Sequence, residues 1–205
     1  MTRRIPIVTT FVVVAAAAVM VMLGFWQLGR VEQKEAMIAQ FERNADDARV
    51  MDMTRLYPDS LESRVYRQVR MDCPDAEGWN AVAGRNANGR TGYVHRYICK
   101  PAVEFGCGLE ERGRCPALLA EIGWSPDPGD PRFTSGVMTG TLVASGDDFK
   151  VVSDEGLAGL EAVARPDPND LPNNHLAYAW QWFFFSLTAL AIYWLALRRK
   201  WREQD

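Results

Sequence analysis

The chain has 205 residues, of which 48% are hydrophobic, and it carries 23 basic against 26 acidic side chains. Between two long charge-free runs near its ends, 17 basic and 24 acidic residues leave a net charge of about −7. An acidic central region without a basic stripe excludes nucleic acid as a natural partner. The two apolar runs indicate a membrane protein, with the lipid bilayer as its surroundings.

The first apolar run covers residues 5–26 and is long enough to cross a hydrocarbon core of about 30 Å as a helix. A cleaved signal peptide is the alternative, since Ala15 to Ala18 offer the small residues that cleavage needs. The run continues past these alanines without a polar region, which favours an uncleaved anchor. We therefore predict a transmembrane helix over residues 5–28, which helix formers in residues 29–44 prolong outward for a few turns.

The region between the spans, residues 29–172, is predicted to be a β-rich domain. Its alternating patterns and its breaks with glycine and proline indicate short strands. The five expected strands cover residues 65–71, 79–83, 92–99, 117–124 and 136–144, and a short helix is expected over residues 154–164. Such closely spaced strands favour an antiparallel sheet that closes toward a small barrel. The region is long enough to bury one core, to which Trp79 and Trp124 are assigned.

All four cysteines lie in this region and none in the spans: Cys73, Cys99, Cys107 and Cys115. In an oxidising compartment an even number indicates two disulfides, with three possible pairings that the sequence leaves open. A zinc or haem-attachment site would need a C-x-x-C spacing, which the chain lacks. We therefore expect structural disulfides, and Cys107 and Cys115 could close a local loop.

The second span is predicted over residues 173–198, because residues 176–197 carry no charge. Asn173 and Asn174 are expected to cap this helix at its start. An aromatic belt follows where rings meet lipid headgroups, with Tyr178, Trp180 and Trp182.

Basic residues mark the outer flank of each span. Arg3 and Arg4 precede the first span, and Arg198 together with Arg199, Lys200 and Arg202 of the tail (residues 199–205) forms a basic cluster at the end of the second span. Since basic residues beside a span stay in the cytoplasm, both termini are expected inside and residues 29–172 outside. The absence of a transit peptide favours the plasma (inner) membrane of a bacterium over an organelle.

The predicted fold class is therefore an α+β membrane protein. Two transmembrane helices form a hairpin, and a small antiparallel, barrel-like extracytoplasmic domain is inserted between them. No G-x-S-x-G elbow, P-loop or G-x-G-x-x-G is present. The sequence thus lacks the motifs that usually indicate acyl transfer, phosphoryl transfer or nucleotide chemistry. We expect a protein that is not an enzyme.

The chain has two histidines, His95 and His175. His95 lies in a strand-like segment and is expected to be a sheet residue with local hydrogen bonds. His175 opens the second span, where it could help to end the linker or act as an axial haem ligand. Helical spacing puts Tyr178, Ala179 and Trp182 on its face, so aromatic rings beside a small residue could leave a slot for a flat macrocycle. The same stripe would also serve for lipid contact or helix packing.

Two motifs coincide at the ends of the spans. The first span ends in L-G-F-W-Q-L-G-R-V-E-Q-K, and the second begins with P-N-N-H-L-A-Y-A-W-Q-W-F. Together they resemble the Surfeit-locus (Surf/Shy) family of cytochrome c oxidase assembly factors, with its W-Q-x-x-R and N-N-H-x-x-Y-A signatures. Between the spans, E-I-G-W-S-P is similar to the family's R-G-W-V-P, with Ile122 where arginine is usual.

The resemblance implies a role in the biogenesis of haem–copper oxidase, in which haem a is bound transiently and delivered into the catalytic subunit. The catalytic subunit of cytochrome c oxidase is the implied partner, and haem A synthase is a further candidate. His175 becomes the leading ligand of the haem iron. The implied supporting residues are Trp26, Gln27 and Arg30, and helical spacing adds Tyr178 and Trp182 from the face of His175. The Arg30 guanidinium could pair with a haem propionate, or it could fix the depth of the span by reaching the headgroups.

Two other hypotheses differ in kind. A cofactor-free membrane scaffold would hold oxidase subunits during assembly, and it would tolerate replacement of His175. A membrane-anchored enzyme or ligand-binding domain would need polar catalytic groups that converge between the spans, for which the sequence offers little.

Overall fold

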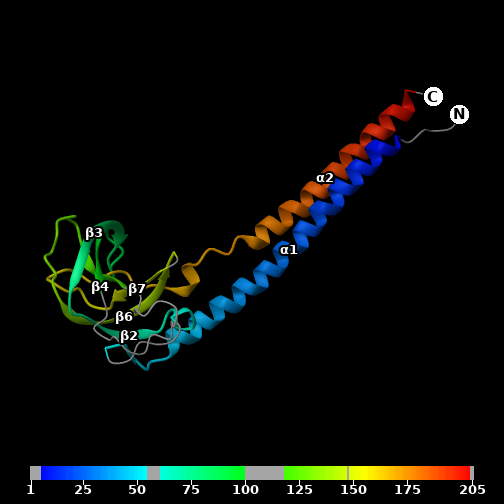
Figure 1. Ribbon diagram of the computed structural model, residues 1–205. Helices are drawn as coiled ribbons and strands as arrows, with labels where there is room; N and C mark the ends of the chain where they lie inside the picture. Colours follow the sequence, from blue (N-terminus) through cyan, green and yellow to red (C-terminus); the bar gives the residue numbers. More distant parts are fainter. Residues whose placement is uncertain (1–5, 55–60, 100–117, 147, 204–205) are drawn as a thin grey trace. The chain divides into compact units, whose positions relative to one another are not determined.

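The computed structural model describes residues 6–54, 61–99, 118–146 and 148–203. The chain divides into two compact units, of which the first combines Met1–Met37 with Leu171–Asp205 and the second is Ile38–Asp170. The first unit is a pair of helices and the second is a β-sheet domain (Figure 1).

Two long helices, α1 (Ile7–Asp46) and α2 (His175–Arg202), supply the first unit. Each is long and apolar enough to cross a membrane. At 1.5 Å per residue their 40 and 28 residues extend for roughly 60 and 42 Å, against a hydrocarbon core of about 30 Å. The expected prolongation of the first helix over residues 29–44 is confirmed. The start of α1 and the end of α2 lie at the same end of the pair (Figure 1).

The two helices meet along a seam of small side chains. The buried residues of the pair are Ala17, Gly24, Ala179 and Ser186, which lie seven positions apart on each helix. Small residues at this spacing let two membrane helices approach closely in a left-handed crossing. The hydroxyl of Ser186 donates a hydrogen bond to the Ala17 carbonyl at 3.1 Å. The seam therefore combines close packing with polar contacts.

The same spacing continues one step further toward the chain ends. Thr10 stands seven residues before Ala17, Tyr193 stands seven after Ser186, and the hydroxyls of Thr10 and Tyr193 share a hydrogen bond. Large apolar side chains point away from the seam, and Phe11 and Leu187 are among those left exposed. Such an inverted arrangement, small inside and large apolar outside, suits lipid better than water.

The second unit contains one mixed β-sheet. Its strands are β1 (Met51–Asp52), β2 (Gln68–Cys73), β3 (Ala76–Arg85), β4 (Thr91–Cys99), β5 (Leu118–Ser125), β6 (Gly136–Ser145) and β7 (Asp148–Ser153). Their order across the sheet is β1-β2-β6-β7-β5-β4-β3. A short 3₁₀ helix, η1 (Glu62–Arg64), lies between β1 and β2 in the sequence, and a second, η2 (Pro168–Asp170), follows β7.

The five expected strands are confirmed as β2 to β6, with ends that differ by a few residues. β1 and β7 were not expected. β7 forms a tight hairpin with β6 and pairs on its other side with β5 in parallel. Because β1 also runs parallel to β2, the sheet is mixed, whereas we expected an antiparallel one.

The helix expected over residues 154–164 is wrong. This segment forms turns and two isolated bridges, in which Glu161 pairs with Trp124 and Val163 with Asn86. Gly159 and Ala158 adopt positive φ values of 79° and 52°, which a right-handed helix does not allow. Backbone pairing to the sheet thus outweighs the helix propensity of the segment.

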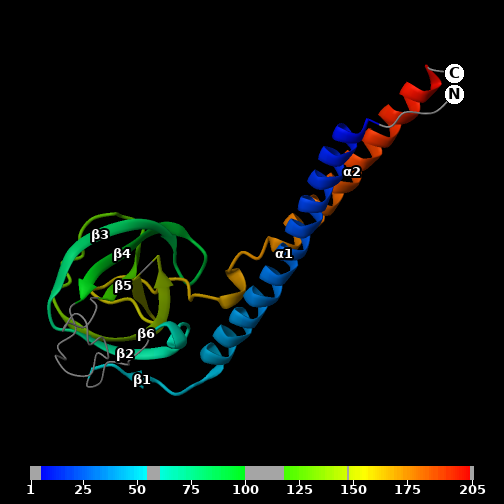
Figure 2. The ribbon, with the colours of Figure 1, turned by 45° about the vertical axis from the view of Figure 1, so that its right-hand side comes forward.

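The sheet curls so that its two edges approach each other (Figure 2). β2 and β3 stand near opposite ends of the strand order, yet only Pro74 and Asp75 separate them in the sequence. The disulfide between Cys73 and Cys99 joins the ends of β2 and β4, whose Cα atoms are 5.0 Å apart there. Such short connections require a strongly curved sheet, so the barrel-like form is confirmed. Cys107 and Cys115 lie outside the described residues.

The core lies inside the curled sheet, and Trp124 closes one part of it. Trp124 is fully buried, as expected, and a Cβ at Gly92 would stand only 2.4 Å from its ring. The backbone of Trp124 both donates to and accepts from Glu161. Trp79, in contrast, is 36% exposed, so its assignment to the core is wrong.

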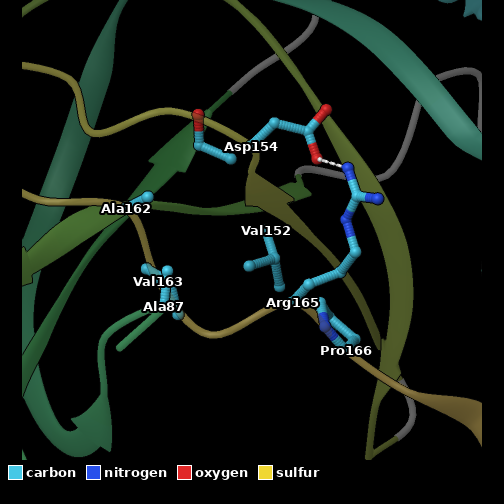
Figure 3. A pocket seen from close by; sticks show the side chains of 8 residues that line it. Ala87, Val152, Asp154, Ala162, Val163, Arg165 and Pro166 are labelled. Atoms are coloured by element: carbon cyan, nitrogen blue, oxygen red, sulfur yellow. Dashed lines mark hydrogen bonds and ion pairs between the residues drawn. The ribbon is translucent and has the colours of Figure 1, made fainter. Parts of the chain in front are cut away.

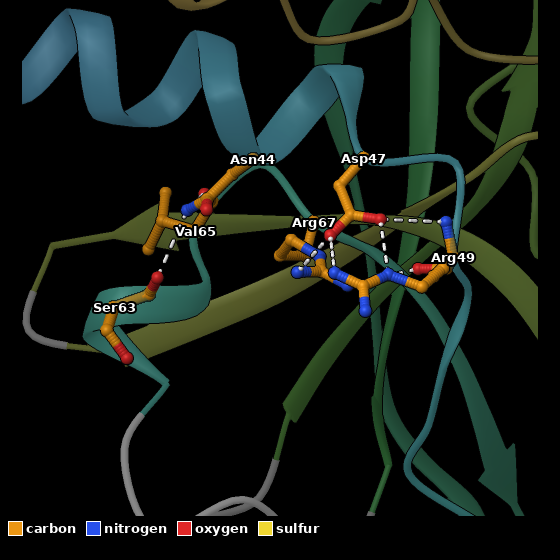
Figure 4. A network of polar contacts seen from close by, with 6 residues as sticks. All are labelled: Asn44, Asp47, Arg49, Ser63, Val65 and Arg67. Atoms are coloured by element: carbon orange, nitrogen blue, oxygen red, sulfur yellow. Dashed lines mark hydrogen bonds and ion pairs between the residues drawn. The ribbon is translucent and has the colours of Figure 1, made fainter.

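The last nine residues of α1 belong to the second unit, and polar contacts fix the end of the helix there (Figure 4). Asn44 donates hydrogen bonds to the carbonyls of Ser63 and Val65 at 3.1 and 2.8 Å. Asp47 accepts hydrogen bonds from Arg49 and forms an ion pair with Arg67 at 2.8 Å. The hydrogen bonds from Arg49 hold the pKa of Asp47 well below its usual range. The helix end and the sheet domain therefore form one rigid contact.

We predict that Gly24→Val destabilises the helix pair. A Cβ at Gly24 would stand 2.4 Å from the Phe183 ring, which also packs on Phe25 and Trp180. Overpacking of this kind costs about 1–3 kcal/mol. Gly29→Val is the matched control, because no atom lies within 4 Å of its would-be Cβ. Thermal unfolding in mild detergent should show a lower Tm for Gly24→Val alone. Equal Tm values for wild type and both variants would contradict close packing of the helices at Gly24.

We also predict that the double variant Cys73→Ala/Cys99→Ala loses about 2–4 kcal/mol of unfolding free energy, because its unfolded chain is no longer constrained. Denaturant unfolding of the purified protein measures the loss. A non-reducing peptide map of the wild type should recover Cys73 linked to Cys99. Recovery of Cys73 with a different cysteine would show that the pairing is incorrect.

Candidate functional site

His175 begins α2, and its ring contacts the other helix of the pair. Its Nδ1 lies 2.8 Å from Oε1 of Gln27 on α1. A carboxamide oxygen only accepts hydrogen bonds, so Nδ1 carries the proton and donates it. In a neutral imidazole the other nitrogen, Nε2, then has a free lone pair. This half-buried ring therefore presents one nitrogen that can bind a metal ion.

The asparagines before His175 do not cap the helix as we expected. Asn174 occupies the N-cap position, but its side chain makes no capping hydrogen bond. The side-chain oxygen of Asn173 is buried and has no hydrogen-bond partner within the described ranges. His175 itself is engaged with Gln27. The start of α2 is thus fixed by a contact across the helix pair rather than by a local cap.

His95 is different, because both of its ring nitrogens are occupied. Nδ1 accepts from Nε1 of Trp79 at 3.3 Å, and Nε2 lies 2.8 Å from the hydroxyl of Ser125. The side chain has no exposed surface, and burial lowers the pKa of His95. The expectation of a sheet residue with local hydrogen bonds is confirmed. Among the contacts of the described residues, both nitrogens of His95 are occupied, whereas His175 is engaged through Nδ1 alone.

Trp26 and Arg30 contact each other near Gln27 on α1. The Arg30 guanidinium carbon lies 6.0 Å from the centre of the Trp26 ring, and Nη1 donates to Gln33 at 2.9 Å. Trp26 is 57% exposed. A ring contact between the helices is made by Phe25 and Phe183, with centroids 5.4 Å apart. The exposed guanidinium remains within reach of a ligand.

The slot expected beside His175 is filled. Ala179 has no exposed surface, because its small side chain lies on the seam between the helices. Tyr178 is 50% exposed, and Trp182 packs edge-on against Phe185, with ring centroids 6.3 Å apart. A flat ligand would therefore have to contact the aromatic outer surface of the pair instead of entering between the helices.

Sequence reasoning missed the residues that set this geometry. Gly24 and Phe183 bring the helices close, and Ala17 and Ser186 fix their register. The signal was present in the sequence, because both spans carry small residues that lie seven positions apart. It could have been found only by comparing the two apolar runs with each other.

The described part of the sheet domain shows no comparable site. A cavity of about 210 Å³ is lined by Ala87, Val152, Ser153, Asp154, Ala162, Val163, Arg165 and Pro166 (Figure 3). Its charged groups, Asp154 and Arg165, are paired with each other at 3.1 Å. The buried carboxylate of Glu121 is likewise neutralised, by Arg96 and Lys150. No group of three metal-binding side chains occurs among the residues the structure describes.

The comparisons with known proteins identify the family. The model of the SURF1 family matches residues 14–187, which include α1 from its second turn, the whole sheet domain and the first half of α2. No curated protein matches the chain. The match covers well over half of the chain and both of the motifs that carry the resemblance. The chain therefore belongs to the SURF1 family of cytochrome c oxidase assembly factors.

Proposed function

We propose that this oxidase assembly factor binds haem a at the end of the helix pair that carries His175, and assists its insertion into the catalytic subunit of cytochrome c oxidase. The observation that carries the proposal is the contact of His175 Nδ1 with Gln27, which leaves Nε2 without a hydrogen-bond partner in the described part of the chain. Neutral imidazole is a common axial ligand of haem iron. The bound haem would supply the redox-active iron, and the protein would supply the ligand and the surface.

The surrounding residues fit a haem. Trp26 and Tyr178 expose aromatic surface on the two helices that also carry Gln27 and His175. Arg30 lies one helical turn beyond Trp26, and its planar guanidinium matches a propionate carboxylate. An open surface site of this kind suits a protein that hands its ligand on, because the ligand can leave without unfolding the helix pair.

We infer that the protein lies in the plasma (inner) membrane of a bacterium, with both termini in the cytoplasm. The last turn of α2 carries Arg199, Lys200 and Arg202, and basic flanks are retained on the cytoplasmic side. On this arrangement the sheet domain and His175 are periplasmic, where disulfides form. The proposed role needs no catalytic residue, and haem A synthase is a second proposed partner.

We predict that His175→Ala abolishes haem binding. The protein is co-expressed with haem A synthesis, purified in detergent, and measured by absorption spectroscopy. Wild type should show a haem a band that the variant lacks. His95→Gln is the matched control, because both nitrogens of His95 are already occupied, and it should keep the band.

Two results would contradict this prediction in different ways. Equal haem in wild type and in folded His175→Ala would remove His175 as the ligand. No haem in either protein, together with oxidase assembly that survives His175→Ala, would favour a cofactor-free scaffold.

We predict a smaller effect for Arg30→Ala. Arg30 is exposed, and a solvent-exposed ion pair contributes up to about 1 kcal/mol, which corresponds to a loss of haem affinity of up to roughly 5-fold. Arg43→Ala, on the distal part of the same helix, is the control. Haem titration at low and at high salt measures both. An Arg30→Ala affinity equal to that of wild type at low salt would show that Arg30 does not pair with a propionate.

A further inference from the structure

The two histidines of this chain are held in opposite proton arrangements. His175 faces a carbonyl oxygen with Nδ1, so its proton lies on Nδ1. His95 faces the N–H of Trp79 with Nδ1, so that nitrogen is an acceptor and the proton lies on Nε2, toward Ser125. In each case the hydrogen bond made by one nitrogen determines the state of the other.

We propose that Gln27 is a positioning residue for His175. Its side-chain oxygen holds the imidazole in the Nδ1–H form and orients the ring, so that Nε2 is the nitrogen presented to a ligand. The part of this inference that concerns haem rests on the proposed function, whereas the proton arrangement of His175 does not. No other residue with a described contact to the His175 ring competes for this role.

The physical basis is the preference of a histidine side chain in water, which is the Nε2–H form. Without an acceptor at Nδ1, the proton would lie mostly on Nε2 and block the lone pair that a metal needs. An acceptor at Nδ1 also makes the imidazole a more basic ligand and fixes the plane of its ring. Loss of such an outer partner typically weakens metal binding by 10- to 100-fold.

The helix seam brings Gln27 and His175 into register. Gln27 lies three residues after Gly24 on α1, and His175 lies four residues before Ala179 on α2, which are the seam residues at this end of the pair. Gln27 and His175 each lie about one helical turn from the seam residue of their own helix. The 2.8 Å contact therefore depends on the close approach that the small side chains allow.

The deciding experiment reads both histidines in one spectrum of the haem-free protein. Full-length protein labelled with ¹⁵N in the histidine rings is studied in detergent by long-range ¹H–¹⁵N NMR at about pH 8. His175 should show the Nδ1–H pattern and His95 the Nε2–H pattern. Because the chain has only these two histidines, His95 serves as an internal standard.

Three variants isolate the role of Gln27. Gln27→Leu removes the acceptor and should shift His175 toward the Nε2–H form without changing His95. Gln27→Glu keeps an acceptor and should preserve the Nδ1–H form. Gln181→Leu makes the same change as Gln27→Leu at an exposed position of α2 and should alter neither ring. An Nε2–H pattern for His175 in wild type, or no change in Gln27→Leu, would overturn the inference.

Haem binding adds an independent measurement. Gln27→Leu should bind haem a roughly 10- to 100-fold more weakly than wild type, and Gln27→Glu should restore binding with a lower midpoint potential, since a more basic ligand stabilises ferric iron. Equal affinities for wild type and Gln27→Leu would also overturn the inference, while the proposed function would stand. If wild type binds no haem, the proposed function fails, and the NMR spectra alone decide the role of Gln27.

Discussion

The close approach of two membrane helices is the constraint on which the rest of this structure depends. In lipid, apolar side chains gain little by facing one another, so helices associate through dense packing and hydrogen bonds. Here Ala17 and Gly24 on α1 meet a matching repeat on α2, and the Ser186 hydroxyl bonds to a backbone carbonyl. The repeat of seven fixes depth, rotation and register together. The contact between His175 and Gln27 depends on that register.

A hydrogen bond across the pair gives His175 its chemical character. His95, the other histidine, has a structural role, because both of its ring nitrogens are hydrogen-bonded and its side chain is buried. At position 175 one nitrogen anchors the ring and the other remains open. The difference arises from the partner of Nδ1, a donor in one case and an acceptor in the other. Residue identity alone therefore does not distinguish the ligand from the structural residue.

Local patterns in the sequence were sufficient for the spans and for most strands. The charge-free runs predicted α1 and α2, and alternation predicted β2 to β6. The errors share a cause, which is pairing over long distances in the sequence. Residues 154–164 have helix-forming side chains, but Trp124 and Asn86 supply backbone partners that turn the segment into bridges. β7 was missed because its place between β6 and β5 is set by tertiary pairing rather than by a distinctive pattern.

The site shows the same limit. The motifs at the ends of the spans drew attention to His175 and Gln27 separately, but nothing in either motif brings their side chains together. The expected slot beside Ala179 was wrong, because a small residue on a helix face marks packing as readily as it marks a cavity. Only the observed contact between the helices shows that Ala179 marks packing and not a cavity.

The link between Cys73 and Cys99 has a consequence for when the domain can be completed. It encloses β3 and β4 in a covalent loop, so the hairpin at one edge of the sheet cannot separate from β2 once the bond has formed. Cytosolic thiols are kept reduced, so a chain whose domain has not crossed the membrane would carry two buried thiols at this position, and the hairpin would be held to the sheet through the pairing of β4 with β5. On the topology that we propose, with the sheet domain outside the cytoplasm, the disulfide would form only after the domain has crossed the membrane. A domain retained on the reducing side would lack this cross-link and would be cleaved more readily by proteases.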